Sequence, residues 1–259
     1  MQPECGLHTE CTEDTMFSGR LTCVQHRHGY RYSIDSLLLA HFVAPGKHDH
    51  ILDIGAGCGI VSLILAYRWP GVTVSALEIQ NGFVSLIKQN IERNQFHRRI
   101  RVIEGDLCRI NKLIGPGAFE LVVCNPPYRK TGSGDLNPEE EQAIARHEIM
   151  ADLRSVIKAA VFAVKTRGRA AFVYPAARCA AMMAELKTSG LEPKRMRIIH
   201  SYPGGEGKLA LVECVKNGGE ELKILPPFFV YLKPGGKYTE EMARIYNAKG
   251  NRSVILSSP

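Results

Sequence analysis

The stretch Ile51-Leu52-Asp53-Ile54-Gly55-Ala56-Gly57-Cys58-Gly59 joins a short apolar run to a turn that contains three glycines. The apolar run is typical of a buried strand in a parallel sheet. Residues 60–68, which follow the turn, have the spacing of a helix. Glycines between a strand and a helix let the backbone approach a bound ligand closely. The stretch therefore predicts the first strand–turn–helix unit of an α/β fold, with a ligand at the turn.

The same alternation of strand and helix continues along the chain from residue 50. Each unit is about 25 residues long, which calls for right-handed crossovers between parallel strands. The fold class that we expect is α/β, with a doubly wound, seven-stranded, mostly parallel sheet. The predicted strands are 51–54, 72–77, 100–104, 119–124, 169–174, 196–202 and 208–215, and the predicted helices are 60–68, 83–94, 139–149, 153–164, 176–188 and 238–246.

Two features concern the end of the predicted sheet. The linker 203–207 is rich in glycine and short, so the last two strands are expected to be antiparallel. Residues 222–232 are apolar and predict an edge strand, although Pro226-Pro227 interrupts them.

The N-terminal region has weaker signals. Residues 1–20 are polar and show no periodicity, so we expect a disordered tail. Weak alternation in residues 21–26 predicts a strand, and residues 29–32 are expected to return beside it as a small hairpin. Residues 36–43 have helical character, and Pro45-Gly46 stops that helix.

No internal repeat and no break in composition appears after residue 45. We therefore divide the chain into a tail at 1–20, a hairpin and helix at 21–45 that pack on the core, and a main domain at 46–259.

The composition allows a full core, because 45% of the 259 residues are hydrophobic. No apolar run approaches the roughly 20 residues that span a bilayer, so no contact with a membrane is expected. The start of the chain lacks the basic and then apolar pattern of a signal peptide. A cytoplasmic protein is the default expectation, and a monomer is favoured.

The formal net charge is +7, which favours an anionic partner, most commonly a nucleic acid. A basic protein without such a partner is the alternative. The 8 cysteines include no Cys-x-x-Cys pair. Reduced thiols are therefore favoured over a zinc site, and no metal is expected.

Acidic residues mark the ends of three successive predicted strands. Asp53 precedes the glycine turn, where a carboxylate suits a ligand with an ammonium group better than one with a phosphate. Glu78 closes the second strand, about 20 residues after the turn, where an acid commonly binds ribose hydroxyls. Asp106 follows the third strand, where its carboxylate suits the amine of an adenine. S-adenosylmethionine fits this set, because it has an amino-acid end, a sulfonium and no phosphate.

The fourth predicted strand ends in Asn125-Pro126-Pro127-Tyr128. Prolines cannot continue a strand ladder, so Asn125 is delivered at a strand end in a stiff loop. The Asn125 carbonyl and the Tyr128 ring suit the edge and the face of a planar group that bears an NH2. A simple turn is the alternative for this motif taken alone.

Together these motifs resemble class I S-adenosylmethionine-dependent methyltransferases, over about residues 22–230. The Asn-Pro-Pro-Tyr motif resembles the catalytic loop of amino-methyltransferases. The stretches 29–40 and 143–148 are similar to the bacterial tRNA (adenine-N6) methyltransferases that modify a valine tRNA. The resemblance implies a Rossmann-like methyltransferase fold, the cofactor S-adenosylmethionine, a tRNA partner, and N6-methylation of an adenine in the anticodon loop.

The resemblance also implies roles for individual residues. Asn125, Pro126 and Tyr128 are expected to be catalytic. The expected cofactor-binding residues are Tyr32, Asp35, Asp53, Gly55, Gly57, Glu78, Ile79, Asp106, Leu107 and Asn125.

Several alternatives stay open at this point. A protein glutamine-N5 methyltransferase and a DNA adenine-N6 methyltransferase share the motif, and an RNA-binding module without catalysis is possible. A dehydrogenase is disfavoured, because the third glycine of the turn comes one residue early. His147 and Glu148 are more typical of a solvated helix face than of an acid–base pair. Two clusters are candidate phosphate contacts, one at residues 26–31 and one at Lys194, Arg195 and Arg197.

Overall fold

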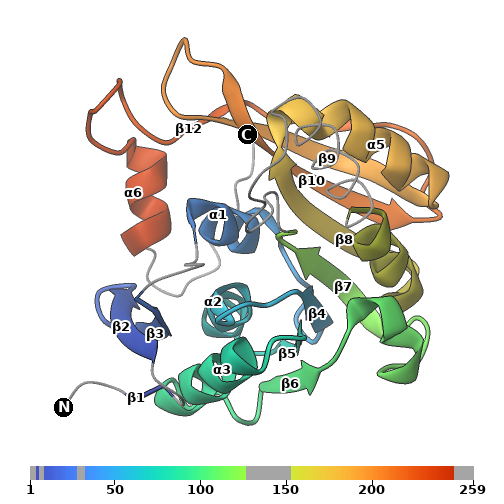
Figure 1. Ribbon diagram of the computed structural model, residues 1–259. Helices are drawn as coiled ribbons and strands as arrows, with labels where there is room; N and C mark the ends of the chain where they lie inside the picture. Colours follow the sequence, from blue (N-terminus) through green and yellow to red (C-terminus); the bar gives the residue numbers. More distant parts are fainter. Residues whose placement is uncertain (1–3, 6–8, 28–32, 127–152, 248–259) are drawn as a thin grey trace, which may run out of the picture.

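Figure 1 shows the computed structural model of the chain, in which residues 4–5, 9–27, 33–126 and 153–247 are described. The strands are β1 (Glu4–Cys5), β2 (Thr9–Met16), β3 (Leu21–His26), β4 (His50–Ile54), β5 (Thr73–Glu78), β6 (Ile100–Glu104), β7 (Phe119–Cys124), β8 (Val164–Pro175), β9 (Leu191–His200), β10 (Gly207–Lys216), β11 (Lys223–Ile224) and β12 (Phe228–Phe229). The helices are α1 (Ile34–Phe42), α2 (Ile60–Arg68), α3 (Asn81–Arg93), the 3-10 helices η1 (Leu107–Lys112) and η2 (Ala176–Arg178), residues 153–163, α5 (Cys179–Thr188) and α6 (Glu240–Asn247). None of the helices in these described ranges is long and apolar enough to cross a membrane.

The main sheet has the strand order β11-β9-β10-β8-β7-β4-β5-β6, and β12 pairs with β9. All seven predicted strands are present in it, and β11 and β12 extend its edge. The pairs of β4 to β8 are parallel, whereas β10 is antiparallel to both of its neighbours. The expected doubly wound, mostly parallel sheet is therefore confirmed, as is the antiparallel pair at its end.

Two layers of helices cover the sheet, one on each face (Figure 1). On one face α1, α2 and α3 pack on residues such as Ile51, Val74 and Val123. On the other face the helix at 153–163 and α5 pack on residues such as Leu52 and Val122. Successive strand residues point to opposite faces, so a strand that is covered on both faces must be apolar throughout. This is why β4 and β7 were recognisable from their sequence.

The expected disorder at residues 1–20 is wrong for residues 9–16. These residues form β2, which pairs antiparallel with β3 from Met16↔Leu21 to Cys11↔His26. The hairpin partner of β3 therefore precedes it, and the predicted return arm at 29–32 lies outside the described residues. Most side chains of β2 are polar, so no hydrophobic pattern predicts this strand. It forms because its backbone pairs with β3 and not because it buries an apolar face.

Smaller corrections concern other predictions. Cys11 is disulfide-bonded, so the expectation of reduced thiols is wrong for this residue. The predicted helix at 139–149 lies outside the described residues, and the division of the chain at residues 20 and 45 stays a prediction.

Candidate functional site

The main sheet gathers four of the expected residues at one edge. Asp53 is the penultimate residue of β4, Glu78 is the last residue of β5, and Asn125 directly follows β7. In the sheet β4 lies between β5 and β7, and all three strands are parallel. Asp106 follows β6, the neighbour of β5. Open α/β sheets bind their ligands at the carboxyl ends of the strands, so this edge is the candidate site.

The glycine turn has the open backbone that the sequence predicts. Gly55 and Gly59 have φ values of 69° and 86°, in the left-handed region that glycine adopts without strain. The amides of Gly55 and Ala56 donate to the carbonyl oxygen of Leu77 at 2.9 and 3.0 Å, which ties the turn to β5. A Cβ on Gly55 would meet no atom within 4 Å, whereas one on Gly59 would lie 3.3 Å from the Ile87 side chain. The turn is thus open at its first glycine and closely packed at its third.

Glu78 connects the glycine turn to the start of α3. Its Oε2 accepts a hydrogen bond from the Gly57 amide at 2.9 Å. Its Oε1 accepts from the amides of Ile79 and Gln80 at 2.9 and 3.0 Å. Three backbone amides therefore hold the carboxylate in place at the strand end before any ligand arrives.

Ile79, the residue after Glu78, is 57% exposed. Ligand pockets combine apolar walls with a few polar groups, so a large exposed apolar side chain next to a fixed carboxylate indicates a ligand-binding surface. Ile79 therefore offers a surface for the flat face of a ring that is anchored at Glu78.

Asp53 is almost fully buried, with 2% of its surface exposed. Its Oδ2 accepts hydrogen bonds from the hydroxyl and the amide of Ser62 in α2, at 2.6 and 3.1 Å. Burial raises the pKa of Asp53 to about 6, the Ser62 hydrogen bonds oppose this rise, and the charge of Glu78 adds to it. The carboxylate therefore ties the strand end that precedes the glycine turn to α2, which follows that turn.

Asp106 is the N-cap of η1, and its Oδ1 accepts a hydrogen bond from the Cys108 amide at 2.8 Å. Leu107, the first residue of η1, is half-buried against the hydrophobic core on the face of the sheet that carries Leu52 and Val122. The 3-10 helix η1 had no counterpart among the predicted elements. It orients Asp106 at the end of β6, two strands away from β4.

Asn125 is held by a residue that the sequence motifs did not single out. Its Nδ2 donates to the Oγ of Ser36 at 2.9 Å, across 89 residues of chain. Ser36 lies in the first turn of α1 and is 4% exposed. Because an amide carries its oxygen opposite its nitrogen, this hydrogen bond turns Oδ1 of Asn125 away from α1. One signal for Ser36 exists in the sequence, since it is a polar residue directly before an apolar run, Leu37-Leu38-Leu39.

The structure places only part of the expected site. Pro126 is described and buried, and Asp35 is half-buried beside Ser36 at the start of α1. Tyr32 and Tyr128 lie outside the described residues. His147 and Glu148 do so as well.

The prediction that Lys194, Arg195 and Arg197 form an open phosphate-binding cluster is wrong. Arg197 is buried, and its guanidinium forms two hydrogen bonds to the Glu241 carboxylate, at 2.8 and 3.1 Å. Arg195 pairs with Glu213 at 3.4 Å. Lys194 donates to backbone carbonyls, including that of Gly219 at 3.2 Å. In the first cluster, the described Arg27 pairs with Glu10 at 2.5 Å.

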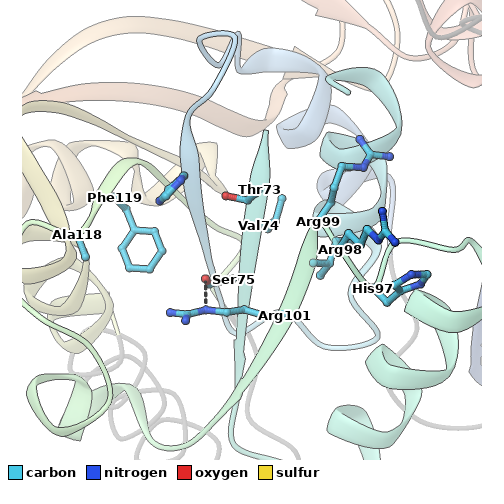
Figure 2. Close-up of a pocket in the computed structure, with 11 residues that line it drawn as sticks. Thr73, Val74, Ser75, His97, Arg98, Arg99, Arg101, Ala118 and Phe119 are labelled. Atoms are coloured by element: carbon cyan, nitrogen blue, oxygen red, sulfur yellow. Dashed lines mark hydrogen bonds between the residues drawn. The ribbon is translucent and has the colours of Figure 1, made fainter. Parts of the chain in front are cut away.

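A hollow of about 380 Å³ opens at the opposite edge, at the amino ends of β4, β5 and β6 (Figure 2). Its lining includes the basic residues His50, Arg98 and Arg101. Nε of Arg101 donates to Ser75 Oγ at 2.9 Å, as the dashed line in Figure 2 marks. This hollow is separated by the length of the strands from the edge that carries Asn125, and no sequence pattern predicts it.

Known proteins resemble the chain in sequence and in fold. A family model described as a methyltransferase small domain matches residues 33–150. A curated tRNA1(Val) (adenine(37)-N6)-methyltransferase of Porphyromonas gingivalis is 31% identical over 189 residues, which cover 71% of this chain and 73% of that protein. A protein of the same name from a Flavobacteriaceae bacterium is 25% identical over 223 residues, which cover 86% of this chain and 92% of that protein. Among solved structures, a predicted O-methyltransferase from Agrobacterium tumefaciens has a TM-score of 0.68 at 21% identity, with 85% of this chain and 99% of that chain covered.

Proposed function

The chain belongs to the methyltransferase family whose curated members include the tRNA1(Val) (adenine(37)-N6)-methyltransferases, and we propose that it methylates N6 of an adenine in a tRNA. The methyl donor is S-adenosylmethionine. We further propose that the substrate is the anticodon loop of a valine tRNA, as the names of the relatives indicate, and that the reaction takes place in the cytoplasm.

The observation that carries the proposal is the orientation of Asn125. The hydrogen bond from Nδ2 to Ser36 directs the Oδ1 carbonyl away from α1, at the end of β7 and one strand from the glycine turn. A carbonyl in that position accepts a hydrogen bond from an amino group that approaches from the carboxyl edge of the sheet. In this family setting the amino group is that of the target adenine.

The chemistry explains why a rigid acceptor matters. The lone pair of an adenine amino nitrogen is delocalised into the ring, so N6 is a poor nucleophile. Acceptance of its two N–H bonds by Oδ1 of Asn125 and by the carbonyl of Pro126 favours a tetrahedral nitrogen with an available lone pair. Because Ser36 holds the Asn125 side chain and the ring of Pro126 restricts the backbone, little reorganisation is needed when the base arrives.

The remaining strand ends suit the cofactor. S-adenosylmethionine, when bound, supplies a methyl group on a sulfonium. Glu78 has the position for the ribose hydroxyls, Ile79 offers an apolar face, and Asp106 has the position for the adenine amine. The open space at Gly55 allows a ligand to approach the backbone there. Asp53, at the strand end before the turn, supplies negative charge for an ammonium group.

The target adenine has to leave its base stack to reach Asn125. Enzymes that act on a base bind it from a loop or flip it out of a helix, and an aromatic ring usually stacks on it. We propose Tyr128 for this role, on the resemblance of its motif.

The experiment incubates the protein with radiolabelled cofactor and, separately, with total tRNA, ribosomal RNA, DNA and protein, and then identifies the labelled residue. We expect label in tRNA, as N6-methyladenosine. Label in DNA or on protein glutamine, with none in tRNA, would overturn the proposal in favour of the alternatives that share the Asn-Pro-Pro-Tyr motif.

The control variant is Asn125→Ala. It removes the acceptor but leaves the glycine turn and Glu78 in place, so we expect loss of methyl transfer with nearly unchanged cofactor binding. Transfer at the wild-type rate by this variant would show that the acceptor mechanism is wrong.

A further inference from the structure

A hairpin near the C-terminal end of the described chain emerges at the same edge of the sheet as Asn125. β12 runs parallel to β9, with Phe228 opposite Ile199 and Phe229 opposite His200, at the carboxyl end of β9. The chain then continues outward into residues 231–238. β9 is antiparallel to β10, and β10 is antiparallel to β8, so β9 and β8 run in the same direction. Because β8 is parallel to β7, β9 is parallel to β7 as well. The hairpin therefore projects beyond the edge that carries the candidate site.

Backbone hydrogen bonds give this hairpin a defined shape. Tyr231 and Tyr238 form an antiparallel bridge. The Leu232 amide donates to the carbonyl of Lys237 at 2.9 Å, and the Gly236 amide donates to that of Lys233 at 2.9 Å. The side chains on the hairpin are thus displayed from an ordered support.

Three tyrosine rings form a stack at its base. The rings of Tyr231 and Tyr238 are 5.1 Å apart and inclined by 19°, and those of Tyr238 and Tyr246 are 5.4 Å apart and inclined by 21°. The stack fixes the plane of the Tyr238 ring, although this residue is 41% exposed. Leu232 next to it is 61% exposed. An oriented aromatic ring beside an exposed apolar side chain is a stacking surface for a base.

The charged residues of the hairpin are both positive. Lys233 and Lys237 are exposed, and neither forms an ion pair among the described residues. The acids of neighbouring α6 are already engaged, since Glu241 binds Arg197 and Glu240 binds Arg244. The hairpin therefore combines aromatic surface with uncompensated positive charge.

The loop between β9 and β10 continues this surface. The Tyr231 amide donates to the carbonyl of Ser201 at 2.8 Å, so the hairpin and the loop are joined. A hollow of about 300 Å³ in the loop is lined by residues that include Tyr202, Glu206 and Lys208, and Glu206 pairs with Lys208 at 3.9 Å, so the loop adds aromatic surface but no net charge. We call the hairpin 231–238 and the loop 201–208 together the carboxyl-edge platform.

We propose that the carboxyl-edge platform binds the nucleotides of the tRNA that flank the target adenine, with Tyr238 stacking on a base and Lys233 and Lys237 contacting phosphates. The inference rests on the proposed function. Four strand spacings separate β7 from β12, or about 19 Å at about 4.8 Å each. That span matches a few nucleotides of a loop or the width of an adjoining stem, so one RNA can occupy Asn125 and the platform together.

The hollow in Figure 2 is the competing basic surface. It lies at the amino ends of the strands, and an RNA bound there cannot also place an adjacent nucleotide at Asn125. It offers Arg98 and Arg101, a pair whose removal lowers the net charge as much as removal of the two platform lysines. This pair is therefore the matched control.

The first measurement is the dissociation constant for an unmodified valine tRNA transcript at several salt concentrations. Each lysine that contacts a phosphate adds about one to the slope of log affinity against log salt concentration. For Lys233→Gln/Lys237→Gln we expect about tenfold weaker binding and a slope reduced by about two. For Arg98→Gln/Arg101→Gln we expect binding within about twofold of wild type. Equal weakening in both variants, or no weakening in the lysine variant, would overturn the proposal.

The second measurement separates the ring from the charge. Tyr238→Ala should raise the KM for tRNA about tenfold with unchanged kcat and cofactor affinity, because a stacking contact is lost. Tyr238→Phe keeps the ring and should retain the wild-type KM. Unchanged KM in Tyr238→Ala would remove the ring from the RNA contact.

The two proposals fail in different ways. If the proposed function is wrong, the wild-type protein itself transfers no methyl group to tRNA. If only the platform is wrong, wild type methylates tRNA and the platform variants do so with the same KM and kcat.

Discussion

At the scale of single residues, Ser36 in α1 holds the side chain of Asn125 at the end of β7. Ser36 Oγ accepts a hydrogen bond from Nδ2 of the Asn125 side chain, at 2.9 Å. A free asparagine amide can rotate by half a turn, which exchanges its oxygen and nitrogen. In the observed orientation the Ser36 hydroxyl is bonded to Nδ2, which leaves Oδ1 as the acceptor that we propose for the incoming amine. Ser36 acts through Asn125 and is a positioning residue.

Ser36→Ala removes this constraint without removing the acceptor. We expect kcat to fall about tenfold, equivalent to about 1.4 kcal/mol, because a lost hydrogen bond is worth about that much. The KM for tRNA and the cofactor affinity should change little. Ser36→Thr retains the hydroxyl and should restore most of kcat. A merely structural role would instead lower the melting temperature and leave kcat per folded molecule unchanged.

Asp53 is the second residue with a specific expectation, because its charge depends on pH near neutrality. Its folded-state pKa of about 6 is raised above the ordinary value of 3.8. The folded state therefore holds the proton more tightly than the unfolded state. This contribution to stability is present at low pH and is lost as the pH rises from about 4 to about 6, and a shift of about two units corresponds to about 3 kcal/mol.

We predict opposite effects of pH on stability and on cofactor binding through this residue. As the pH falls below about 6, Asp53 takes up a proton, and the cofactor affinity of the wild type should fall because the ammonium group loses its counter-charge. Asp53→Asn should bind cofactor weakly at every pH between 5 and 8. The difference in unfolding free energy, Asp53→Asn minus wild type, should rise by about 3 kcal/mol as the pH increases from 4 to 7. Calorimetric titration and urea unfolding check the two parts.

At the scale of elements, α1 connects the candidate site to the core. Its first turn carries Ser36, and its last turn carries His41, which is fully buried. His41 Nδ1 donates to the carbonyl oxygen of Leu37 at 2.9 Å. Burial, and then the charge of Arg68, lower the pKa of His41 from 6.5 to about 3. The imidazole is therefore neutral in the folded protein.

This makes α1 sensitive to acid. A lowered folded-state pKa contributes stability that is present above about pH 6.5 and lost as the pH falls toward 3. Through His41 alone, we expect the wild type to lose about 1.4 kcal/mol of unfolding free energy per pH unit below about pH 6, measured relative to His41→Gln so that the contributions of other groups such as Asp53 cancel. His41→Gln should lose less over the same range. Urea unfolding at pH 7.5, 5.5 and 4.5 measures this, with His97→Gln, at an exposed position, as the control that should behave as wild type.

The elements also show where sequence patterns succeed. α2 and β7 were predicted with their observed bounds, because local residues mark both ends of each apolar run. The run of α2 lies between the glycine turn and a tryptophan, and that of β7 lies between a loop and two prolines. β8 begins at Val164, five residues earlier than predicted, because its polar first half is paired at its start with Phe119. β2 was missed for the same reason, since pairing across a hairpin needs no apolar face.

At the scale of the whole molecule, the strand order brings the candidate site residues together. β5, β4 and β7 are neighbours in the sheet although helices and loops separate them in sequence. This order brings Glu78, Asp53 and Asn125 to adjacent strand ends, and the outer strands β9 and β12 extend the same edge to the carboxyl-edge platform. The proposed tRNA contact follows from this continuity and not from any single motif.

By itself the sequence determined the class of fold, the strands and helices of the central sheet, and the positions of Asp53, Glu78, Asp106 and Asn125 at strand ends. These follow from periodicity and from glycine and proline, which act over a few residues. Only the tertiary structure decided that Ser36 orients Asn125, that Arg197 is committed to Glu241, and that residues 231–238 stand at the edge of the site. Such contacts join residues far apart in the chain, so they depend on how whole elements pack, which no local pattern encodes.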